Sequence, residues 1–311
     1  MSERRVGPWL QWGRLFRVSL APSAVADAAA GILLGAGGWP VGPWGWLLAA
    51  SACTYHGGMA LNDWVDRDRD AKLRADRPIP SGGIAASAAL GAALTLLILG
   101  PALAWFASPA AGLCMAAVAV GAAAYDLFLR GSFSGPLALG MCRSGNVAAA
   151  AVWSHAYAPE GWPGGVAAVA IALYGVYVFW VSRLGTFEDL DGDADLGLAP
   201  ARYARAAGLL LFLLPVAIWL VVPETLRSPW RLLLAVGVSG AAALPVVRRS
   251  FEPLRSSRDV LPLMGAFLRR LLIVTATAAL VVPDPAAPWI AAVILAGYPA
   301  SYLLRVAFPP S

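Results

Sequence analysis

Residues 62–81 read NDWVDRDRDAKLRADRPIPS and contain five of the chain's eighteen acidic residues. A second segment, FEDLDGDAD at residues 187–195, contains five more. Carboxylates this close together repel one another and become harder to ionise unless a cation lies between them. The two segments therefore indicate two cation-binding loops. The alternative is a pair of solvated loops whose acids pair with basic neighbours, which in the first loop are Arg67, Arg69, Lys72, Arg74 and Arg77.

The spacing within the first segment is helical. Asn62, Asp66 and Asp70 recur at every fourth residue and share one helix face, and Asp63 lies close to Asp66 on that face. All four side chains offer oxygen, with no His or Cys among them, and such a set favours a hard ion, above all Mg²⁺. Mg²⁺ takes one or two carboxylates and completes its shell with water and substrate phosphates. The segment therefore predicts a Mg²⁺ site.

The second segment offers two pairs of carboxylates. Asp189 and Asp193 share a helix face, while Asp191 and Asp195 form a rival pair that is rotated away from it. Spacing alone leaves the choice between these pairs open.

The composition indicates an integral membrane protein. Apolar residues make up 59% of the chain and charged residues only 13%, whereas about a quarter of the residues of soluble proteins are charged. Runs near the roughly 20 residues that cross a bilayer occur at 18–36, 44–61, 84–106, 110–129, 136–157, 165–187, 204–222, 230–247, 261–282 and 287–307. They predict one all-α domain over residues 1–311, a bundle of nine or ten transmembrane helices in two four-helix halves. The acid loops at 62–82 and 188–200 each follow the second helix of a half.

The arginines predict the orientation in the membrane. If the N-terminus is cytoplasmic, the arginines of residues 67–77, 183–205 and 248–258 all return to the cytoplasm, and the opposite loops offer only Arg227. Both acid loops then face the cytoplasm from the cell membrane, and the number of helices is even. The net charge of +5 is explained by this topology, so no nucleic-acid partner is expected.

Basic and polar residues near the acid loops are candidate phosphate and acceptor ligands. Arg74 and Arg77 present planar forks of donors suited to phosphate oxygens. Tyr125, Asp126 and Arg130 lie at the cytoplasmic end of the fourth apolar run. Anchoring of helix ends in the membrane is the alternative role for these arginines.

Three polar residues fall inside apolar runs. Asp27 lies mid-membrane in the first run, where an ionisable group is either functional or hydrogen-bonded to a neighbouring helix. The fifth run holds Arg143 and Asn146, about one turn inside the membrane. An arginine at that depth needs an anion, from the protein or from a substrate.

The pattern NDxxDxxxD at residues 62–70, the RPIPSG at 77–82 and the DxxGD at 189–193 together resemble the UbiA superfamily of membrane prenyltransferases. The order of these motifs and their placement after the second and sixth helices agree with the family. In that family nine helices surround a central cavity, and the acid loops bind a polyprenyl diphosphate through Mg²⁺. The strings GMALNDWVDRDRD and YDLFLR are most similar to bacterial members whose acceptors are often unassigned.

The resemblance carries roles to individual residues. Within the second motif Gly197 selects Asp189 and Asp193 over the rival pair. The expected metal ligands are Asn62, Asp63, Asp66, Asp70, Asp189 and Asp193. The expected catalytic residues are Tyr125, Asp126 and Arg130, and the expected diphosphate-binding residues are Arg74, Arg77, Arg130, Arg143 and Asn146. The chain departs from the family at Arg130, where many members carry Lys, at Asp27, where many carry Asn, and in its tenth apolar run.

The resemblance implies Mg²⁺-dependent transfer of a prenyl or polyprenyl group from its diphosphate to an aromatic or other lipophilic acceptor in the membrane. Three alternatives stay open. They are another lipid-linked transfer, such as that of a phosphoribosyl group to a polyprenyl phosphate, a Mg²⁺-gated transporter or scaffold, and a protein that binds Mg²⁺ and lipid without catalysis. A permeation path would place acids along the helices rather than in end loops, which disfavours the transporter.

Overall fold

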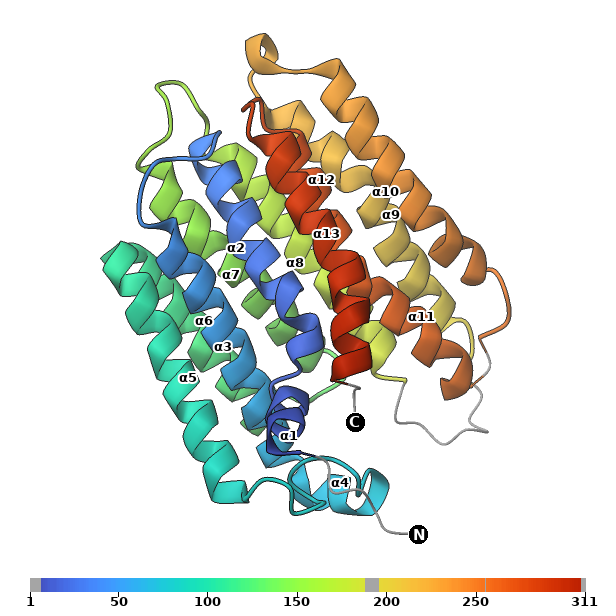
Figure 1. Cartoon of the computed structure of the whole chain (residues 1–311). Helices are drawn as coiled ribbons and strands as arrows, with labels where there is room; N and C mark the ends of the chain where they lie inside the picture. Colours follow the sequence, from blue (N-terminus) through green and yellow to red (C-terminus); the bar gives the residue numbers. More distant parts are fainter. Residues whose placement is uncertain (1–6, 188–195, 255, 309–311) are drawn as a thin grey trace.

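The chain folds into a bundle of α-helices (Figure 1). The structure, a computed structural model, describes residues 7–187, 196–254 and 256–308. The regular elements in those ranges are all helical: α1 (Pro8–Leu15), η1 (Val18–Leu20), α2 (Ala21–Ala36), α3 (Trp44–Val65), α4 (Arg67–Leu73), α5 (Ala86–Ala107), α6 (Pro109–Leu127), α7 (Ser134–His155), α8 (Gly165–Gly185), α9 (Ala199–Val221), η2 (Glu224–Leu226), α10 (Pro229–Arg249), α11 (Ser257–Arg269), α12 (Leu271–Leu280) and α13 (Ala287–Ala307).

The long helices coincide with the apolar runs of the sequence. Eight segments in the described residues are long and apolar enough to cross a membrane, and one of them is α11 and α12 taken together. The expected all-helical, multi-pass membrane fold is therefore confirmed. Helices α3 and α7 are 22 residues long as well, but residues such as Asn62 and Arg143 make them more polar. The total of nine or ten spanning helices stays a prediction.

The helices close into a ring. From α5 to α10, helices that follow one another in the sequence pack against one another, and α3 packs against α2 and α5. Helix α7 packs against α2, and α12 returns to contact both α2 and α10. Helix α13 contacts α2 and α12 and is mostly exposed, so the tenth apolar run lies on the outside of the bundle.

Small residues allow the helices of the first half to approach closely. A Cβ atom added to Gly31 of α2 would lie only 2.3 Å from the backbone oxygen of Val147 on α7. Only glycine fits at this contact, as is common where membrane helices meet.

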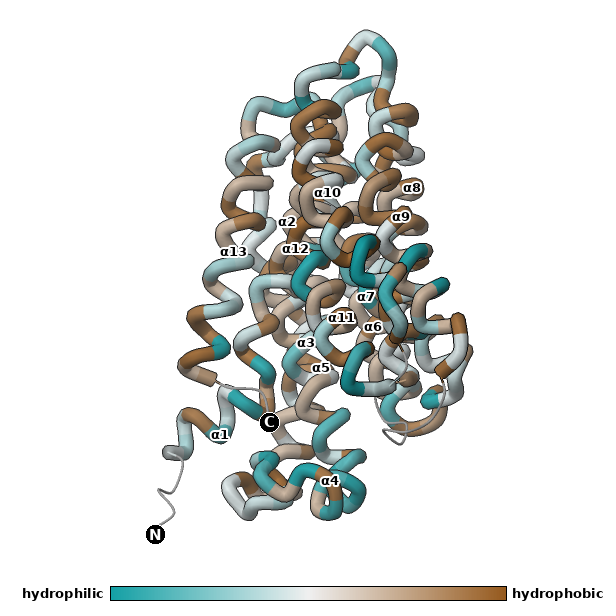
Figure 2. The backbone as a smooth tube through the Cα atoms, turned by 90° about the vertical axis from the view of Figure 1, so that its right-hand side faces the viewer, coloured by the Kyte–Doolittle hydropathy of each residue, from teal (hydrophilic) through white to brown (hydrophobic). Residues whose placement is uncertain are grey.

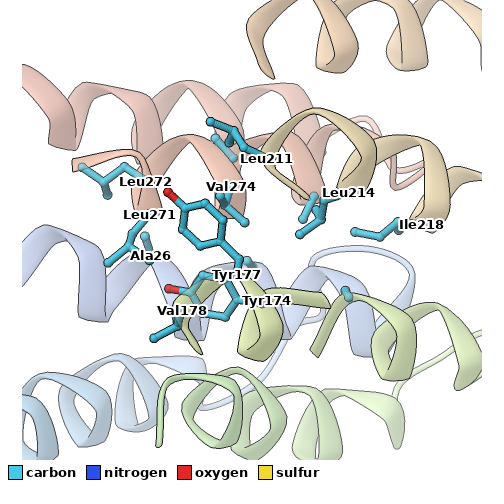
Figure 3. Close-up of a cluster of buried hydrophobic side chains, with 14 of the residues drawn as sticks. Ala26, Tyr174, Tyr177, Val178, Leu211, Leu214, Ile218, Leu271, Leu272 and Val274 are labelled. Atoms are coloured by element: carbon cyan, nitrogen blue, oxygen red, sulfur yellow. The ribbon is translucent and has the colours of Figure 1, made fainter. Parts of the chain in front are cut away.

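The largest buried cluster joins α2, α8, α9 and α12, and Figure 3 shows Tyr177 lying among Leu211, Leu272 and Val274. The hydroxyl of Tyr177 donates a 2.8 Å hydrogen bond to the backbone oxygen of Phe267 on α11. Its polar group is therefore satisfied in an apolar environment. The bond ties α8 to α11.

Hydrophilic residues gather at one end of the bundle, around α4 (Figure 2). Helix α1 lies at the same end (Figure 1). It exposes Trp9 and buries Leu15, a division typical of a helix that lies in the membrane surface. This end carries the first acid loop.

Candidate active site

The first acid loop begins where α3 ends. Asp66 caps α3 at its C-terminus and precedes α4. The backbone N–H of Asp66 donates to the backbone oxygen of Asn62 (2.9 Å), and the backbone N–H of Asp70 donates to the backbone oxygen of Asp66 (2.8 Å). These two bonds maintain the i to i+4 repeat across the junction. The helical spacing expected for Asn62, Asp66 and Asp70 is therefore present, although α3 and α4 are separate helices.

The segment after α4 folds back onto the acids. Arg77 is only 7% exposed, and its Nη1 atom lies 2.5 Å from Asp70 and 3.5 Å from Asp63. Pro78 and Pro80 follow directly and stiffen the turn. Arg77 therefore balances the charge of two buried carboxylates at once.

Arg17 was not a predicted site residue, yet it reaches the same acids from the other side. Its Nη2 atom donates to Asp63 at 3.0 Å and to Asn62 at 3.4 Å. Burial lowers the pKa of Arg17, but Asp63, Tyr55 and Asp70 together outweigh that effect, so the pKa lies above its usual value. Arg17 has a left-handed backbone (φ 48°), which is unfavourable for a residue with a side chain.

The end of α6 brings a fourth carboxylate, that of Asp126, to the junction. Asn62 donates through Nδ2 to Oδ1 of Asp126 at 2.9 Å. Arg130 contacts Asp66 directly and lies 3.5 Å from Asp126, so its guanidinium bridges the two carboxylates. It also lies 6.0 Å from the ring of Tyr125. The structure thus brings the predicted catalytic residues together with the first acid loop.

An apolar cavity of about 290 Å³ opens beside this constellation. Arg17, Asn62, Tyr125 and Asp126 line it near the acid loop. Its other walls are mostly apolar and come from α3, α6, α7, α8 and the junction of α11 with α12, with Met59, Val118, Leu139, Val178, Val181, Leu268 and Leu271 among the lining residues. A lipid tail has room here next to charged groups.

Arg143 and Asn146 line the same cavity but contact other partners. Nε of Arg143 lies 3.1 Å from Oδ2 of Asp27, so the protein supplies an anion for this arginine. Asp27 is fully buried. Its partners are Arg143 on α7 and Tyr174 on α8. Asp27 is therefore hydrogen-bonded to neighbouring helices, which is one of the two roles expected from its position in the sequence.

The donor set at the acid loop suits a hard divalent cation. Asp66 and Asp126 provide carboxylate oxygens and Asn62 provides an amide oxygen, and oxygen is the ligand atom that Mg²⁺ prefers. Arg130 already provides positive charge between two of these carboxylates. The part of the chain that the structure describes has no group of three or more His, Cys, Asp or Glu arranged to hold a metal. Asp189 and Asp193 lie outside the described residues.

Gly197 lies near the end of the second acid loop and has a left-handed backbone (φ 58°). Glycine adopts this conformation without strain. Arg74 lies at the C-terminal end of α4, outside the lining of the cavity.

The fold and the site define a multi-pass membrane protein that has an apolar cavity and, at one end of it, a set of carboxylates and arginines. The chain belongs to the UbiA prenyltransferase family, whose family model matches residues 24–269. Members and homologues of this family are prenyltransferases, and this chain is a prenyltransferase of the same kind.

Individual relatives agree with this assignment. A protoheme IX farnesyltransferase of Acidiphilium cryptum is 29% identical over 262 residues, which cover 80% of this chain and 79% of the relative. A digeranylgeranylglyceryl phosphate synthase of Ignicoccus hospitalis is 42% identical over 64 residues, 21% of each chain.

Solved structures share the fold at low identity. A structure of digeranylgeranylglyceryl phosphate synthase has a TM-score of 0.62 at 17% identity and covers 89% of this chain and 98% of its own. A UbiA homologue from Archaeoglobus fulgidus bound to GPP and Mg²⁺ has a TM-score of 0.59 at 13% identity, over 86% of this chain and 99% of its own.

Proposed function

We propose that the chain transfers a prenyl group from its diphosphate to a lipophilic acceptor, with Mg²⁺, at the cytoplasmic side of the cell membrane. The observation that carries this proposal is the arginine-bridged set of Asn62, Asp66 and Asp126 at one end of an apolar cavity. A prenyl diphosphate has the matching chemistry, because its head is a polyanion and its tail is a hydrocarbon.

The metal ligands in this proposal are Asn62, Asp63, Asp66 and Asp70 of the first loop and Asp189 and Asp193 of the second. When bound, Mg²⁺ supplies positive charge to the diphosphate and so assists its departure from the allylic carbon. The neighbour from Archaeoglobus fulgidus bound to GPP and Mg²⁺ supports this choice of ion.

Arginines hold the diphosphate in this proposal. Arg74, Arg77 and Arg130 were assigned this role from the sequence, and the position of Arg17 beside Asn62 supports adding it to them. Each guanidinium offers several N–H donors in a fixed plane, which match phosphate oxygens. Arginines that now contact carboxylates can turn to the diphosphate once a cation neutralises those carboxylates.

The cavity walls protect the reactive carbon. As the bond to the diphosphate breaks, positive charge develops on the allylic carbon, and water in the cavity would capture it. The apolar walls exclude water, and the faces of Tyr125 and Tyr55, which also lines the cavity, can stabilise the charge. Tyr125 and Asp126 are placed to orient the acceptor, whose nucleophilic atom then forms the new bond.

Product analysis tests the proposed function. Purified protein in lipid is incubated with a prenyl diphosphate, Mg²⁺ and a membrane lipid extract, and the products are identified by mass spectrometry. We expect an acceptor that has gained the mass of the prenyl group, with release of pyrophosphate. A sugar phosphate on a polyprenyl phosphate, formed when phosphoribosyl diphosphate is supplied instead, would identify phosphoribosyl transfer. Binding without any product would identify a non-catalytic protein.

A further inference from the structure

A polar cluster is buried in the cavity wall, away from the acid loop. Asp27 of α2 forms its centre. The hydroxyl of Tyr174 donates to Asp27 Oδ1 at 2.6 Å, Arg143 Nε lies 3.1 Å from Oδ2, and Asn146 Nδ2 donates to Oδ2 at 3.4 Å. Nδ2 of Asn146 also lies 2.7 Å from the hydroxyl of Ser51 on α3. Residues of four helices, α2, α3, α7 and α8, therefore form this cluster.

The cluster carries no net charge. The only ionised groups in it are the carboxylate of Asp27 and the guanidinium of Arg143, and they neutralise each other. An anionic ligand would need a positive charge that is not already balanced, because desolvating an anion is costly. The cluster therefore suits an uncharged polar group.

Two residues of the cluster that line the cavity have unused hydrogen-bonding capacity. Asn146 is only 6% exposed, and its Oδ1 atom is buried without a hydrogen-bond partner among the described residues. Its amide nitrogen must face Asp27 and the carbonyl of Ala24, which are both acceptors, so Oδ1 lies on the other edge of the amide. The side chain of Arg143 is 14% exposed, and it lines the cavity beside Asn146.

A buried acceptor without a donor is unfavourable, and a ligand that supplies an O–H or N–H would relieve it. Nη2 of Arg143 already donates to Ser23, Asp27 and Tyr174, but its Nη1 takes part in no hydrogen bond seen among the described residues and can donate to an acceptor atom of the same ligand. A hydroxyl group provides both, since it donates one hydrogen and accepts at its lone pairs.

We infer that this cluster is an acceptor-binding site, and that it selects an uncharged acceptor bearing a hydroxyl group over one bearing a carboxylate. The hydroxyl donates to Oδ1 of Asn146 and accepts from Arg143. This inference rests on the proposed prenyl transfer. It assigns Arg143 and Asn146 to the acceptor rather than to the diphosphate.

The bound hydroxyl anchors the acceptor and is not the atom that is prenylated. The helical rise places Ser51, a member of the cluster, about 16 Å from Asn62 along α3. An acceptor held at the cluster therefore presents its nucleophilic atom toward the acid loop from the far end of the cavity.

A matched pair of probes tests the selectivity. The probes are 4-hydroxybenzyl alcohol and 4-hydroxybenzoate, which share the phenol and differ in the group expected at the cluster. Binding of each to the full chain in lipid is measured at a pH where the benzoate is ionised, with and without a prenyl diphosphate. We expect the wild-type protein to bind the alcohol at least ten times more tightly than the carboxylate.

Removing the balancing carboxylate should weaken or abolish this preference. In Asp27→Asn the charge of Arg143 becomes unbalanced, so we expect the ratio of the two affinities to shift at least tenfold toward the carboxylate. Asn146→Ala should weaken binding of the alcohol at least tenfold. Ser239→Ala is the control, because Ser239 is also a buried hydroxyl without a partner but lies on α10, outside the cavity lining.

The outcomes separate this inference from the proposed function. A wild-type preference for the carboxylate, binding of neither probe, or an unchanged ratio in folded Asp27→Asn would overturn the inference. If the wild-type protein also bound no prenyl diphosphate, the proposed function would fall with it. Normal binding of the diphosphate would leave the proposed function standing.

Discussion

At the scale of single residues, the site depends on arginine–carboxylate pairs that join distant parts of the chain. Arg130 bridges two carboxylates: that of Asp66, which is 64 residues away, and that of Asp126 in the last turn of α6. Arg17 reaches Asp63 across 46 residues. These carboxylates are therefore not buried without a counter-charge, which would be strongly unfavourable.

Replacing one carboxylate tests the assignment of the metal ligands. We expect Asp66→Ala to lower the rate of pyrophosphate release by about a hundredfold or more, because charge stabilisation at the leaving group is lost. The control is Asp68→Ala in the same loop. The side chain of Asp68 is 88% exposed and pairs with Arg67. The control should keep its activity within about twofold, in line with small surface effects. Full activity of folded Asp66→Ala would refute the assignment.

The left-handed backbone of Arg17 predicts an order of stability. Both Arg17→Ala and Arg17→Gly remove the partner of Asp63, but only glycine adopts φ 48° without strain. The glycine variant should therefore be more stable than the alanine variant by about 1 kcal/mol. Unfolding of the two purified proteins in mixed detergent measures the difference. Equal stability would mean that the backbone of Arg17 is not held in this conformation.

In these arginine–carboxylate pairs, the sequence predicts the carboxylates better than it predicts their arginine partners. Asn62, Asp66 and Asp70 could be selected because their spacing is local, and the bridging position of Arg130 is marked by a helix end. Arg17 has no local signal, because its role depends on a contact across 46 residues. In the sequence alone, Arg17 looks the same as an arginine that anchors the end of a helix in the membrane.

At the scale of elements, close approach of α2 and α7 positions the polar cluster in the cavity wall. Gly31 lies one helical turn from Asp27 on α2, and Val147 follows Asn146 on α7. The contact at Gly31 therefore sets the distance across which Asp27 and Arg143 interact.

Two glycine substitutions should have opposite effects. Gly31→Ala would place a Cβ 2.3 Å from the backbone oxygen of Val147, and we expect it to destabilise the protein by about 1–3 kcal/mol through overpacking. Gly91→Ala on α5 has nothing within 4 Å, and it should stabilise the protein by up to about 1 kcal/mol through helix propensity. Thermal unfolding of both variants measures these changes. A stable Gly31→Ala protein would show that α2 and α7 are less closely packed.

The elements themselves were largely predictable. Apolar runs alone locate the long helices, because a bilayer demands about 20 apolar residues for each crossing. The break between α11 and α12 was not predicted, since the run 261–282 is apolar throughout except for Arg269 and Arg270. The way in which α12 returns to α2 depends on contacts that a run of apolar residues does not encode.

At the scale of the whole molecule, the proposed function requires one orientation of the helix bundle in the membrane. The acid loop lies at the end of the bundle that carries α1 and α4 (Figure 1), and the loop after α7 belongs to the opposite side. Counting arginines predicts that the α4 end is cytoplasmic. In this orientation the site would be open to diphosphates on the cytoplasmic side of the membrane.

Labelling of introduced cysteines tests the orientation. With the three native cysteines replaced, Lys72→Cys in α4 and Glu160→Cys after α7 each place an exposed thiol in one of the two loops. A membrane-impermeant maleimide should label Glu160→Cys in intact cells and Lys72→Cys only after permeabilisation. The reverse pattern would place the active site outside the cytoplasm.

Release of pyrophosphate from prenyl diphosphates is the measurement that tests the central claim most directly. The purified protein is assayed in lipid against a panel of chain lengths, with Mg²⁺ or with EDTA, and with or without membrane lipid extract. We expect pyrophosphate release that requires Mg²⁺ and that increases when the extract supplies an acceptor. Absence of release from folded protein under every condition would contradict this expectation, as would release that EDTA leaves unchanged.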